Sequence, residues 1–332
     1  MINPSQKLNP KIFETDVEQI PIRKGFGEGL LKAAEMNTQV VGLCADLTDS
    51  TMMTGFKQRF PGRFIEMGIA EQNLATVASG MAAMGKIPFI TSYAMFSPGR
   101  NWEQIRTTIA YNNVPVKIAG SHAGVSVGPD GGTHQAIEDI ALMRVIPRMV
   151  VISPCDAIEA RKATIAASQT PDPTYIRLAR EKTPIITTEE TPFTIGKAEV
   201  MFKSQGSNFN VGIIATGALL HKTLKVAQKL EAEGKSVIVL NMATIKPLDV
   251  DAVIQLTGQT GALVTVEEHQ IIGGLGSAVA ECVAMNNPVP IEYVGIKDVF
   301  GQSGTPDELI EHYGMGEKDI YAAVQKVMLR KK

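Results

Sequence analysis

Short apolar runs alternate with helix-length segments along most of this chain, and this alternation restricts the folds open to it. The runs are rich in Val and Ile and nearly continuous, which is typical of strands buried on both faces of a parallel sheet. The expected strands are residues 40–45, 63–66, 86–91, 114–119, 149–152, 174–178, 211–215, 236–241, 262–267 and 290–294. The expected helices are residues 25–36, 50–60, 71–84, 100–111, 134–144, 156–168, 219–232, 249–256 and 275–285, with two more at the end. We therefore predict an α/β fold with two domains, each a mainly parallel sheet flanked by helices.

The domain organisation follows from a break in this pattern. Residues 181–209 are rich in Pro and Thr and carry a polar tip, as interdomain segments often do. A length of 332 residues also favours two domains. We predict an N-terminal arm over residues 1–15, a first domain over 16–190, a linker over 191–209 and a second domain over 210–332.

Composition excludes several classes of protein. The formal net charge is −2, so no basic field favours nucleic acid or an anionic membrane. There is no apolar stretch long enough to span a bilayer, and the polar N-terminus lacks the apolar core of a signal peptide. Cys44, Cys155 and Cys282 are widely spaced in apolar runs, which indicates buried thiols of a reducing compartment. We expect a cytoplasmic protein.

Glu71 is the first candidate for chemistry. It stands in the run MGIAEQN, after an apolar strand and a Gly turn, at the start of a helix. A carboxylate at a helix start is usually only a favourable partner of the helix dipole. Here the helix behind it is rich in Ala, Ser and Gly, which allows another backbone to approach closely. This pattern favours a helix at a dimer interface with Glu71 at its buried end.

The second candidate is the run SHAGVSVGPDGGTHQAIED, residues 121–139, a Gly-rich loop that leads into a helix. His122, Asp130 and His134 are more polar groups than a turn requires, and loops on an α/β scaffold often carry ligand contacts. A third run, TSYAMFSPGRNWEQIR, holds Tyr93 and Phe96 close to Trp102. Each ring alone is more often core than site, but as a cluster the three form a possible stacking wall for a flat ring.

Other motifs carry less weight. The run GFGEG at 25–29 lacks both a preceding strand and the G-x-G-x-x-G spacing, so we discard a dinucleotide loop. The run IIGGLGSAVAE at 271–281 could bind an anion at a helix start, although close packing or an interface is the favoured interpretation. There is no Walker A, C-x-x-C or H-E-x-x-H run, and the five histidines are too dispersed for zinc. We predict no metal site on this chain.

Taken together, these motifs resemble the C-terminal half of transketolase, over nearly the whole chain. The resemblance implies a pyrimidine-binding domain followed by a transketolase C-terminal domain. The motifs that carry it, in family order, are ADLTDST (45–51), MGIAEQN (67–73), the loop from His122 to His134, IEDIALMRVIP (137–147), YIRLARE (175–181) and DVFGQSG (298–304).

The resemblance implies thiamine diphosphate as cofactor and a role for several residues. Glu71 matches the activating glutamate, which hydrogen-bonds the aminopyrimidine and favours the imino tautomer that removes the thiazolium C2 proton. Tyr93 and Phe96 match aromatics that pack on the aminopyrimidine, and Asp46 matches an aspartate near the thiazolium. Trp102 receives no role, because the aromatic segment aligns with an offset near Gly99.

The same resemblance implies a set of substrate contacts. Arg23, Ser50 and Arg180 match residues that hold a sugar phosphate, for which the planar guanidinium is well suited. His122 and His134 match histidines that contact the oxygens or phosphate of the sugar and take part in catalysis. Asp130 matches an aspartate that hydrogen-bonds a hydroxyl of the substrate.

The chain lacks the GDG motif through which transketolases hold the cofactor's diphosphate and its Mg²⁺. We therefore expect a separate, N-terminal subunit to bind the diphosphate and to supply most of the ligands of the Mg²⁺ or Ca²⁺ ion. The expected assembly is a heterotetramer with self-association through both domains and active sites between unlike chains.

Alternatives remain open at this point. Ala70 and Gln72 stand where many full-length transketolases have Arg and His, and the AEQ form also resembles the β subunit of 2-oxoacid dehydrogenases. A deoxyxylulose-phosphate-synthase-like half is a related possibility. A third hypothesis is a non-catalytic scaffold partner of another thiamine enzyme. The favoured function is transfer of a two-carbon ketol unit from a ketose phosphate to an aldose phosphate, in the pentose phosphate pathway; the sequence does not fix the sugars, and His269 receives no role.

Overall fold

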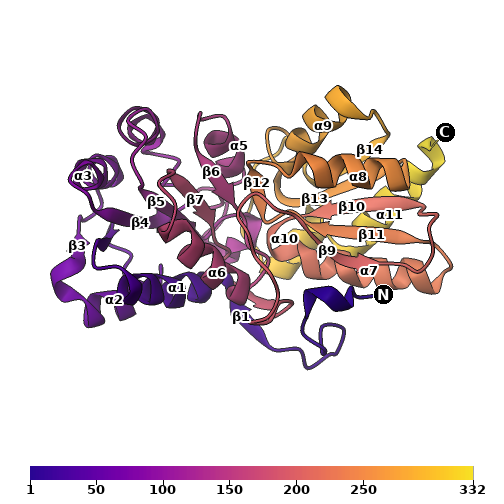
Figure 1. Cartoon of the computed structure of the whole chain (residues 1–332), viewed down its shortest axis with the longest axis horizontal. Coiled ribbons are helices and arrows are strands. Elements are labelled where there is room, and N and C mark those ends of the chain that lie inside the picture. Colours follow the sequence, from indigo (N-terminus) through magenta and orange to yellow (C-terminus); the bar gives the residue numbers. More distant parts are fainter. Residues whose placement is uncertain (332) are drawn as a thin grey trace.

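A computed structural model describes residues 1–331 and places two α/β domains side by side (Figure 1). The N-terminal half of the chain builds the domain drawn in indigo and magenta, and the C-terminal half builds the domain drawn in orange and yellow. The predicted α/β fold with mainly parallel sheets is confirmed. None of the helices in residues 1–331 is long and apolar enough to cross a membrane.

The first domain is organised around a seven-stranded sheet with the order β12-β6-β7-β5-β4-β2-β3. All its strands run parallel except β12, which pairs antiparallel with β6. The strands are β2 (Val40–Cys44), β3 (Phe64–Glu66), β4 (Ile87–Tyr93), β5 (Lys117–Ser121), β6 (Val150–Ile152), β7 (Thr174–Arg177) and β12 (Thr244–Lys246). A separate antiparallel pair joins β1 (Gln19–Pro21) to β8 (Lys182–Pro184).

Helices cover both faces of this sheet, with α1, α2 and α6 below it and α3 above it in Figure 1. They are α1 (Ile22–Met36), α2 (Thr54–Arg59), α3 (Glu71–Ala83), α4 (Trp102–Gln104), α5 (Asp139–Arg144) and α6 (Ala157–Ser168). Short 3₁₀ turns are η1 (Pro4–Gln6), η2 (Pro61–Arg63) and η4 (Val125–Asp130). The expected helix over 100–111 continues past α4 as a π-helical stretch, η3 (Ile105–Ala110), and the expected helix over 134–144 starts only at α5.

The GFGEG run lies inside α1, where its glycines allow two helices to touch. A Cβ atom on Gly25 would lie 1.8 Å from the carbonyl oxygen of Ala157, and one on Gly29 would lie 2.7 Å from that of Arg161. The absence of side chains therefore permits the close contact of α1 with α6, so the glycines of this run serve helix packing.

The second domain contains a five-stranded sheet with the order β14-β13-β10-β11-β9. Four strands are parallel and β9 is antiparallel to β11. The strands are β9 (Glu199–Lys203), β10 (Val211–Ala215), β11 (Val237–Asn241), β13 (Leu263–Gln270) and β14 (Ile291–Ile296). The helices are η5 (Gly217–Leu219), α7 (Leu220–Ala232), α8 (Val250–Thr260), α9 (Leu275–Asn286), α10 (Pro306–His312) and α11 (Glu317–Arg330). Apolar side chains of both sheets form the cores, and Cys44, Cys155 and Cys282 are buried free thiols as predicted.

The border between the domains differs in detail from a simple linker. Strand β9 lies inside the expected linker, residues 191–209, and it belongs to the second sheet. Strand β12 comes from the C-terminal half of the chain yet completes the first sheet by pairing with β6. The C-terminal half of the chain is thus tied to the first domain through backbone hydrogen bonds.

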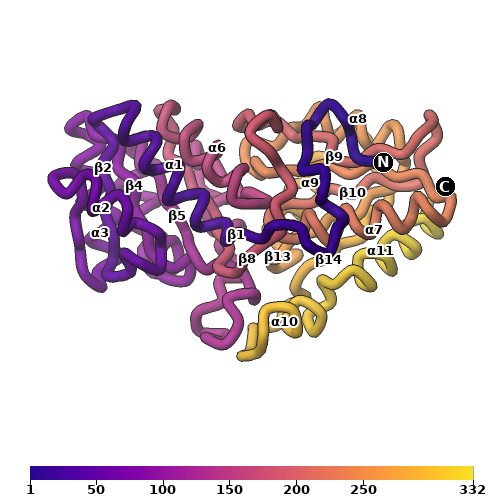
Figure 2. The backbone as a smooth tube through the Cα atoms, turned by 90° about the horizontal axis from the view of Figure 1, so that it is seen from below, coloured from indigo at the N-terminus to yellow at the C-terminus, as the bar shows by residue number. Residues whose placement is uncertain are grey.

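The N-terminal arm lies on the second domain before the chain enters the first, as Figure 2 shows in indigo. Ile2 forms a bridge with Phe202, and the backbone N–H of Asn3 donates to the carbonyl of Met201 at 3.0 Å. Further along, the side chain of His221 hydrogen-bonds the carbonyl of Ile12 at 2.7 Å. The arm therefore belongs structurally to the domain that lies farthest from it in sequence.

Candidate active site

Glu71 is the first residue of α3 and is only 2% exposed. The chain leaves β3 through a turn in which Gly68 has φ +69°, a conformation that favours glycine. The side-chain amide of Asn101 donates to the backbone carbonyl of Glu71 at 2.9 Å and fixes the start of the helix. The predicted buried carboxylate at a helix start is thus present in the structure.

A surface cavity of about 560 Å³ opens beside this carboxylate. Its lining comes from the start of α3 and from the helical segment that begins at α4: Ile69, Ala70, Glu71, Gln72, Asn73, Thr76, Arg100 and Gln104. Ile69, at the rim, is 75% exposed although it is apolar. A buried carboxylate beside an open, partly apolar hollow is a candidate ligand contact.

Arg100 is the residue of this site that the sequence reasoning missed. Its Nη1 atom donates to Oε2 of Glu71 at 2.7 Å, and its guanidinium lies 4.8 Å from the ring centre of Phe96. Arg100 is therefore the link between the carboxylate and the aromatic cluster. The available signal was a cation in SPGRNW, directly after the aromatic residues, but a lone arginine in a loop is usually solvated.

Tyr93, Phe96, His122 and His134 form one aromatic cluster. The ring of Tyr93 stacks on His122 with 3.8 Å between centroids and lies nearly parallel to Phe96 at 6.2 Å. The ring of His134 meets Phe96 edge-on at 5.5 Å. The structure therefore brings together the aromatic residues of one predicted run and the histidines of another. Trp102 is not part of this cluster, since its indole N–H donates to the carbonyl of Leu142 at 2.8 Å.

His122 is buried at 2% exposure and has a positive φ of 56° at the end of β5. Burial, and then the charges of Arg23 and Arg180, lower the pKa of its imidazole from 6.5 to about 3. The Oγ atom of Ser121 lies 2.8 Å from Nδ1, so a hydrogen bond fixes the ring. His122 is consequently neutral at physiological pH and acts as a hydrogen-bonding group without charge.

Arg23 and Arg180 bring two cations to the same edge of the sheet. Arg23 donates from Nε to the carbonyl of Arg180 at 3.1 Å and from Nη1 to that of Ser50 at 2.6 Å. Arg180 donates from Nη1 to the carbonyl of Val127 at 2.6 Å. Each guanidinium has five N–H donors, so donors remain for an anion. Burial, together with the charge of Arg180, lowers the pKa of Arg23.

The structure leaves two predicted residues outside this cluster. Asp46 and Asp130 are exposed, and within residues 1–331 neither carboxylate makes a hydrogen bond or ion pair with the other predicted site residues. Asp46 has φ +57° and donates its backbone N–H to the carboxylate of Glu66 at 2.7 Å. The same residues, 1–331, contain no group of three or more His, Cys, Asp or Glu side chains placed to hold a metal ion.

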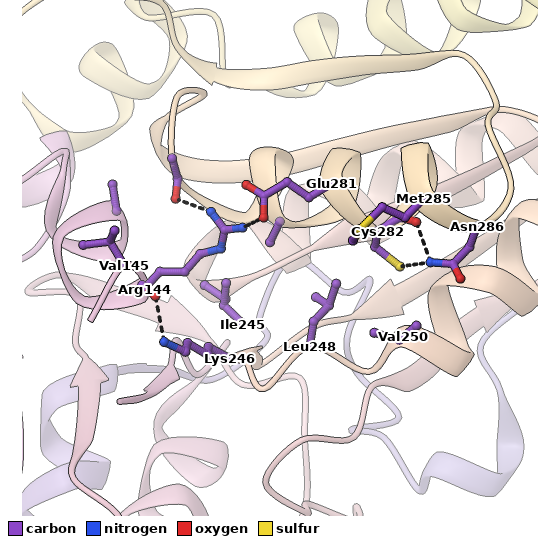
Figure 3. Close-up of a pocket in the computed structure, with 13 residues that line it drawn as sticks. Arg144, Val145, Ile245, Lys246, Leu248, Val250, Glu281, Cys282, Met285 and Asn286 are labelled. Atoms are coloured by element: carbon purple, nitrogen blue, oxygen red, sulfur yellow. Dashed lines mark hydrogen bonds and ion pairs between the residues drawn. The ribbon is translucent and has the colours of Figure 1, made fainter. Parts of the chain in front are cut away.

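A larger cavity of about 670 Å³ lies between the domains, away from the predicted residues (Figure 3). An ion pair between Arg144 and Glu281 crosses it, and the ammonium of Lys246 donates to the carbonyl of Arg144 at 2.9 Å. Its other labelled walls are mainly apolar, among them Val145, Leu248 and Met285. Its lining holds no histidine, and its one arginine is already paired with Glu281, so we place the candidate site at the sheet edge beside His122.

The fold and the site define a member of the transketolase family. A family model of the transketolase pyrimidine-binding domain matches residues 18–185, and a model of the transketolase C-terminal domain matches residues 196–320. The chain therefore belongs to the transketolases and contains these two domains in this order.

Among its relatives are proteins of the same length. The chain is 40% identical to the 6-deoxy-6-sulfo-D-fructose transketolase subunit SqwH of Clostridium sp. over 96% of this chain and 98% of that protein. It is 41% identical to a putative transketolase C-terminal section of Methanocaldococcus jannaschii, covering 92% and 96%. Human transketolase is 34% identical over 94% of this chain, which spans only 50% of that longer protein. A solved split-gene transketolase, described as an inactive β4 tetramer, is 44% identical with a TM-score of 0.87 over 94% of this chain and all of that one.

Proposed function

We propose that this chain is the C-terminal subunit of a split, thiamine-diphosphate-dependent transketolase. In this proposal it transfers a two-carbon ketol unit from a ketose phosphate to an aldose phosphate together with a separate diphosphate-binding subunit. The observation that carries the proposal is the buried carboxylate of Glu71 at the mouth of an open cavity, joined through Arg100 to the aromatic cluster. Similarity to relatives named as transketolase subunits or sections supports the split arrangement.

The residues of this chain fit the pyrimidine end of thiamine diphosphate. A buried carboxylate can hold a proton at a ring nitrogen, and water is largely kept from it. Tyr93 and Phe96 present nearly parallel rings that can flank a flat heterocycle. When bound, thiamine diphosphate supplies the acidic thiazolium carbon at which ketol transfer takes place. We propose Asp46 as a further contact near that ring, with Mg²⁺ or Ca²⁺ and the diphosphate held mainly by the partner subunit.

The cationic edge of the sheet fits an anionic sugar. Arg23 and Arg180, with Ser50 beside them, are proposed to bind the phosphate of the substrate through unused N–H donors. His122 and His134 are proposed to hydrogen-bond sugar oxygens near the reacting carbon and to assist proton movement there. Asp130, exposed at the end of η4, is the proposed contact to a substrate hydroxyl.

A second candidate substrate is a sulfonated sugar. The relative with 40% identity is named as a 6-deoxy-6-sulfo-D-fructose transketolase subunit. A sulfonate, like a phosphate, is an anion with several oxygen acceptors, so the arginine pair suits either group. The two candidates therefore differ in the sugar and share the same catalytic set.

The test is reconstitution with the diphosphate-binding subunit, thiamine diphosphate and Mg²⁺. Transfer from xylulose 5-phosphate, and separately from 6-deoxy-6-sulfofructose, to an aldose phosphate is measured for each subunit alone and for the mixture. We expect transfer only from the mixture. Full activity of this chain alone would contradict the split enzyme, activity only with pyruvate would favour a 2-oxoacid enzyme, and no activity with any donor would favour a scaffold.

We further propose a heterotetramer with two copies of each subunit and active sites at the interfaces between unlike chains. We place the contact between unlike chains at the open cavity beside Glu71, whose rim includes exposed Ile69. Sedimentation of the mixture tests it, with a 2:2 complex as the expected species.

A further inference from the structure

The segment from His122 to Gln135 carries three of the predicted substrate residues but has little regular structure of its own. Its backbone reaches positive φ at His122, Gly124, Gly128 and Gly131, and its only regular element is η4. A path of this kind lacks the internal hydrogen-bond ladder of a helix or strand. Its shape must therefore be fixed by the groups that surround it.

Much of that surrounding surface belongs to the second domain. A Cβ atom on Gly124 would lie 2.1 Å from Oε1 of Glu268. One on Gly132 would lie 2.6 Å from the carbonyl of Gly301, and one on Gly131 would lie 2.7 Å from Oγ of Ser303. Figure 2 shows the segment, in magenta, beside α10. The glycines allow the segment to lie directly on the other domain.

Glu268, near the end of β13, makes the central polar contact. It is 3% exposed, and its Oε1 atom accepts a hydrogen bond from the backbone N–H of Ser126 at 2.7 Å. A buried N–H without a partner costs about 1–3 kcal/mol, so this carboxylate contributes substantially to the observed path of the segment. The acceptor comes from the second domain, whereas the donor lies four residues after His122.

Two neighbours hold Glu268 and the segment in place. The backbone carbonyl of Glu268 accepts from Nη2 of Arg177 at 2.8 Å, and Arg177 is paired through Nε with the buried carboxylate of Asp139 at 2.9 Å. The side-chain amide of Gln135 reaches the carbonyls of Val125 at 3.1 Å and of Gln302 at 3.0 Å. The contact therefore rests on a buried network that spans both domains.

We propose that Glu268 is a positioning residue of the second domain, which holds the His122–Gln135 segment in the shape that presents His122 and His134 to the sugar. This inference rests on the proposed function for the roles of the two histidines. It gives the second domain a part in substrate recognition, in addition to subunit assembly, through contacts made by Glu268 and the 301–306 loop.

Hydrogen exchange in the full-length chain tests the physical contact without any assay of activity. In Glu268→Ala we expect the amide of Ser126 to exchange about tenfold faster or more than in the wild type. In Glu268→Gln, which keeps an oxygen acceptor, we expect exchange close to the wild-type rate. Unchanged protection of Ser126 in Glu268→Ala would overturn the proposal.

Glu267→Ala is the matched control, because Glu267 is the adjacent and equally buried carboxylate. Its oxygens accept from the backbone N–H groups of Leu275 and Gly276 at the start of α9, 2.7 Å away in both cases. We expect this variant to expose those two amides and to leave Ser126 protected. If both alanine variants loosen both sites equally, the effect is general destabilisation and the proposal is wrong.

A second variant keeps the test informative if Glu268→Ala does not fold. Gly124→Ala keeps the Glu268 side chain but adds a Cβ atom 2.1 Å from its Oε1 at a position with φ +87°, so the clash and the backbone strain both act against the same contact. We expect faster exchange at Ser126 and a higher KM for the aldose phosphate in the reconstituted enzyme, with unchanged affinity for thiamine diphosphate. Protection of Ser126 as in the wild type would contradict the proposal. An inactive wild-type mixture with normal exchange results would instead contradict only the proposed function.

Discussion

The guanidinium of Arg100 lies 2.7 Å from the carboxylate of Glu71, and the two groups differ sharply in their access to water. The side chain of Glu71 is 2% exposed, whereas that of Arg100 is 48% exposed. The carboxylate is thus fixed by the fold, while the arginine approaches it from the surface. In the proposed enzyme, Arg100 orients the carboxylate of Glu71 and contacts the ring of Phe96.

Arg100→Ala should reduce turnover of the reconstituted enzyme by roughly tenfold, much less than removal of the Glu71 carboxyl, because one charge-assisted hydrogen bond is lost. Steady-state kinetics of the mixture measures this change. Arg106→Ala is the control, since Arg106 is exposed on the same helical segment and should leave turnover unchanged. Equal losses in both variants would remove the special role of Arg100.

Arg23→Ala should raise KM for the phosphorylated acceptor by roughly ten- to hundredfold with a smaller effect on kcat, because hydrogen bonds to a charged group are worth about 1.5–3 kcal/mol. Lys24→Ala is the neighbouring control, since Lys24 is exposed and its contact with Glu28 is a surface pair. The thermal midpoint of each variant is measured in parallel, as Arg23 also bonds the carbonyl of Ser50. A KM that does not respond to loss of Arg23 would place the phosphate elsewhere.

His122 should make the chain less stable in acid. Its pKa is lowered to about 3 in the folded state, below the value near 6.5 of an unfolded chain, so between these values the unfolded state binds more protons. The stability associated with a neutral His122 is complete above pH 6.5 and is lost as pH falls toward 3. At pH 5.5 the loss should reach about 1.4 kcal/mol.

Urea unfolding at pH 7.5, 6.5 and 5.5 measures this effect by comparison with His122→Asn. Asparagine tolerates the positive φ of this position and does not titrate, so its stability should change less over the same range. Parallel curves for the two proteins would show that His122 is not the titrating group.

Asp139→Asn should destabilise the chain by about 3–5 kcal/mol, because the charge of buried Arg177 would lose its partner. The phenol of Tyr175 also donates to the same carboxylate oxygen at 2.6 Å. Asp16→Asn breaks an exposed ion pair with Lys11 and should give no measurable change in the urea midpoint. An equally small effect at Asp139 would show that the interdomain network does not support the fold.

Elements with a strong local pattern were predictable from sequence. The run VVGLC became β2 and VGIIA became β10, because near-continuous branched apolar residues fit a strand covered on both faces. The helix expected over 156–168 is α6, and the side chain of Asp156 caps its start. The resemblance assigned Tyr93 to the cofactor and His122 and His134 to the substrate, and in the structure the three rings lie together.

Features that depend on distant partners were not predictable. Strand β12 has only three residues, and it is a strand because it pairs with β6. Lys117 interrupts an apolar strand, yet it is fully buried, with its ammonium 2.9 Å from the carbonyl of Thr170 and 2.5 Å from that of Asp172. Burial lowers its pKa to about 7. The contact of Glu268 with Ser126 likewise depends on the fold, because the two residues are far apart in sequence.

The run IIGGLGSAVAE shows how a local motif can be satisfied from within the chain. An anion at the start of α9 was one interpretation of its glycines. In the structure the carboxylate of Glu267 occupies that position and accepts from two backbone N–H groups, and a Cβ atom on Gly274 would lie 2.1 Å from Oε2. The glycines of this run therefore serve close packing within the chain, which was the favoured interpretation.

The central claim is that Glu71 activates the cofactor within an enzyme that needs a second subunit. The most direct measurement is ketol transfer by the mixture of this chain with the diphosphate-binding subunit, thiamine diphosphate and Mg²⁺, using wild-type chain and Glu71→Gln. Circular dichroism and sedimentation confirm that the variant folds and assembles. We predict that Glu71→Gln lowers turnover by roughly 10²–10⁴-fold, the usual contribution of a positioned proton-transfer group. Turnover of the assembled Glu71→Gln enzyme at the wild-type rate would contradict the claim.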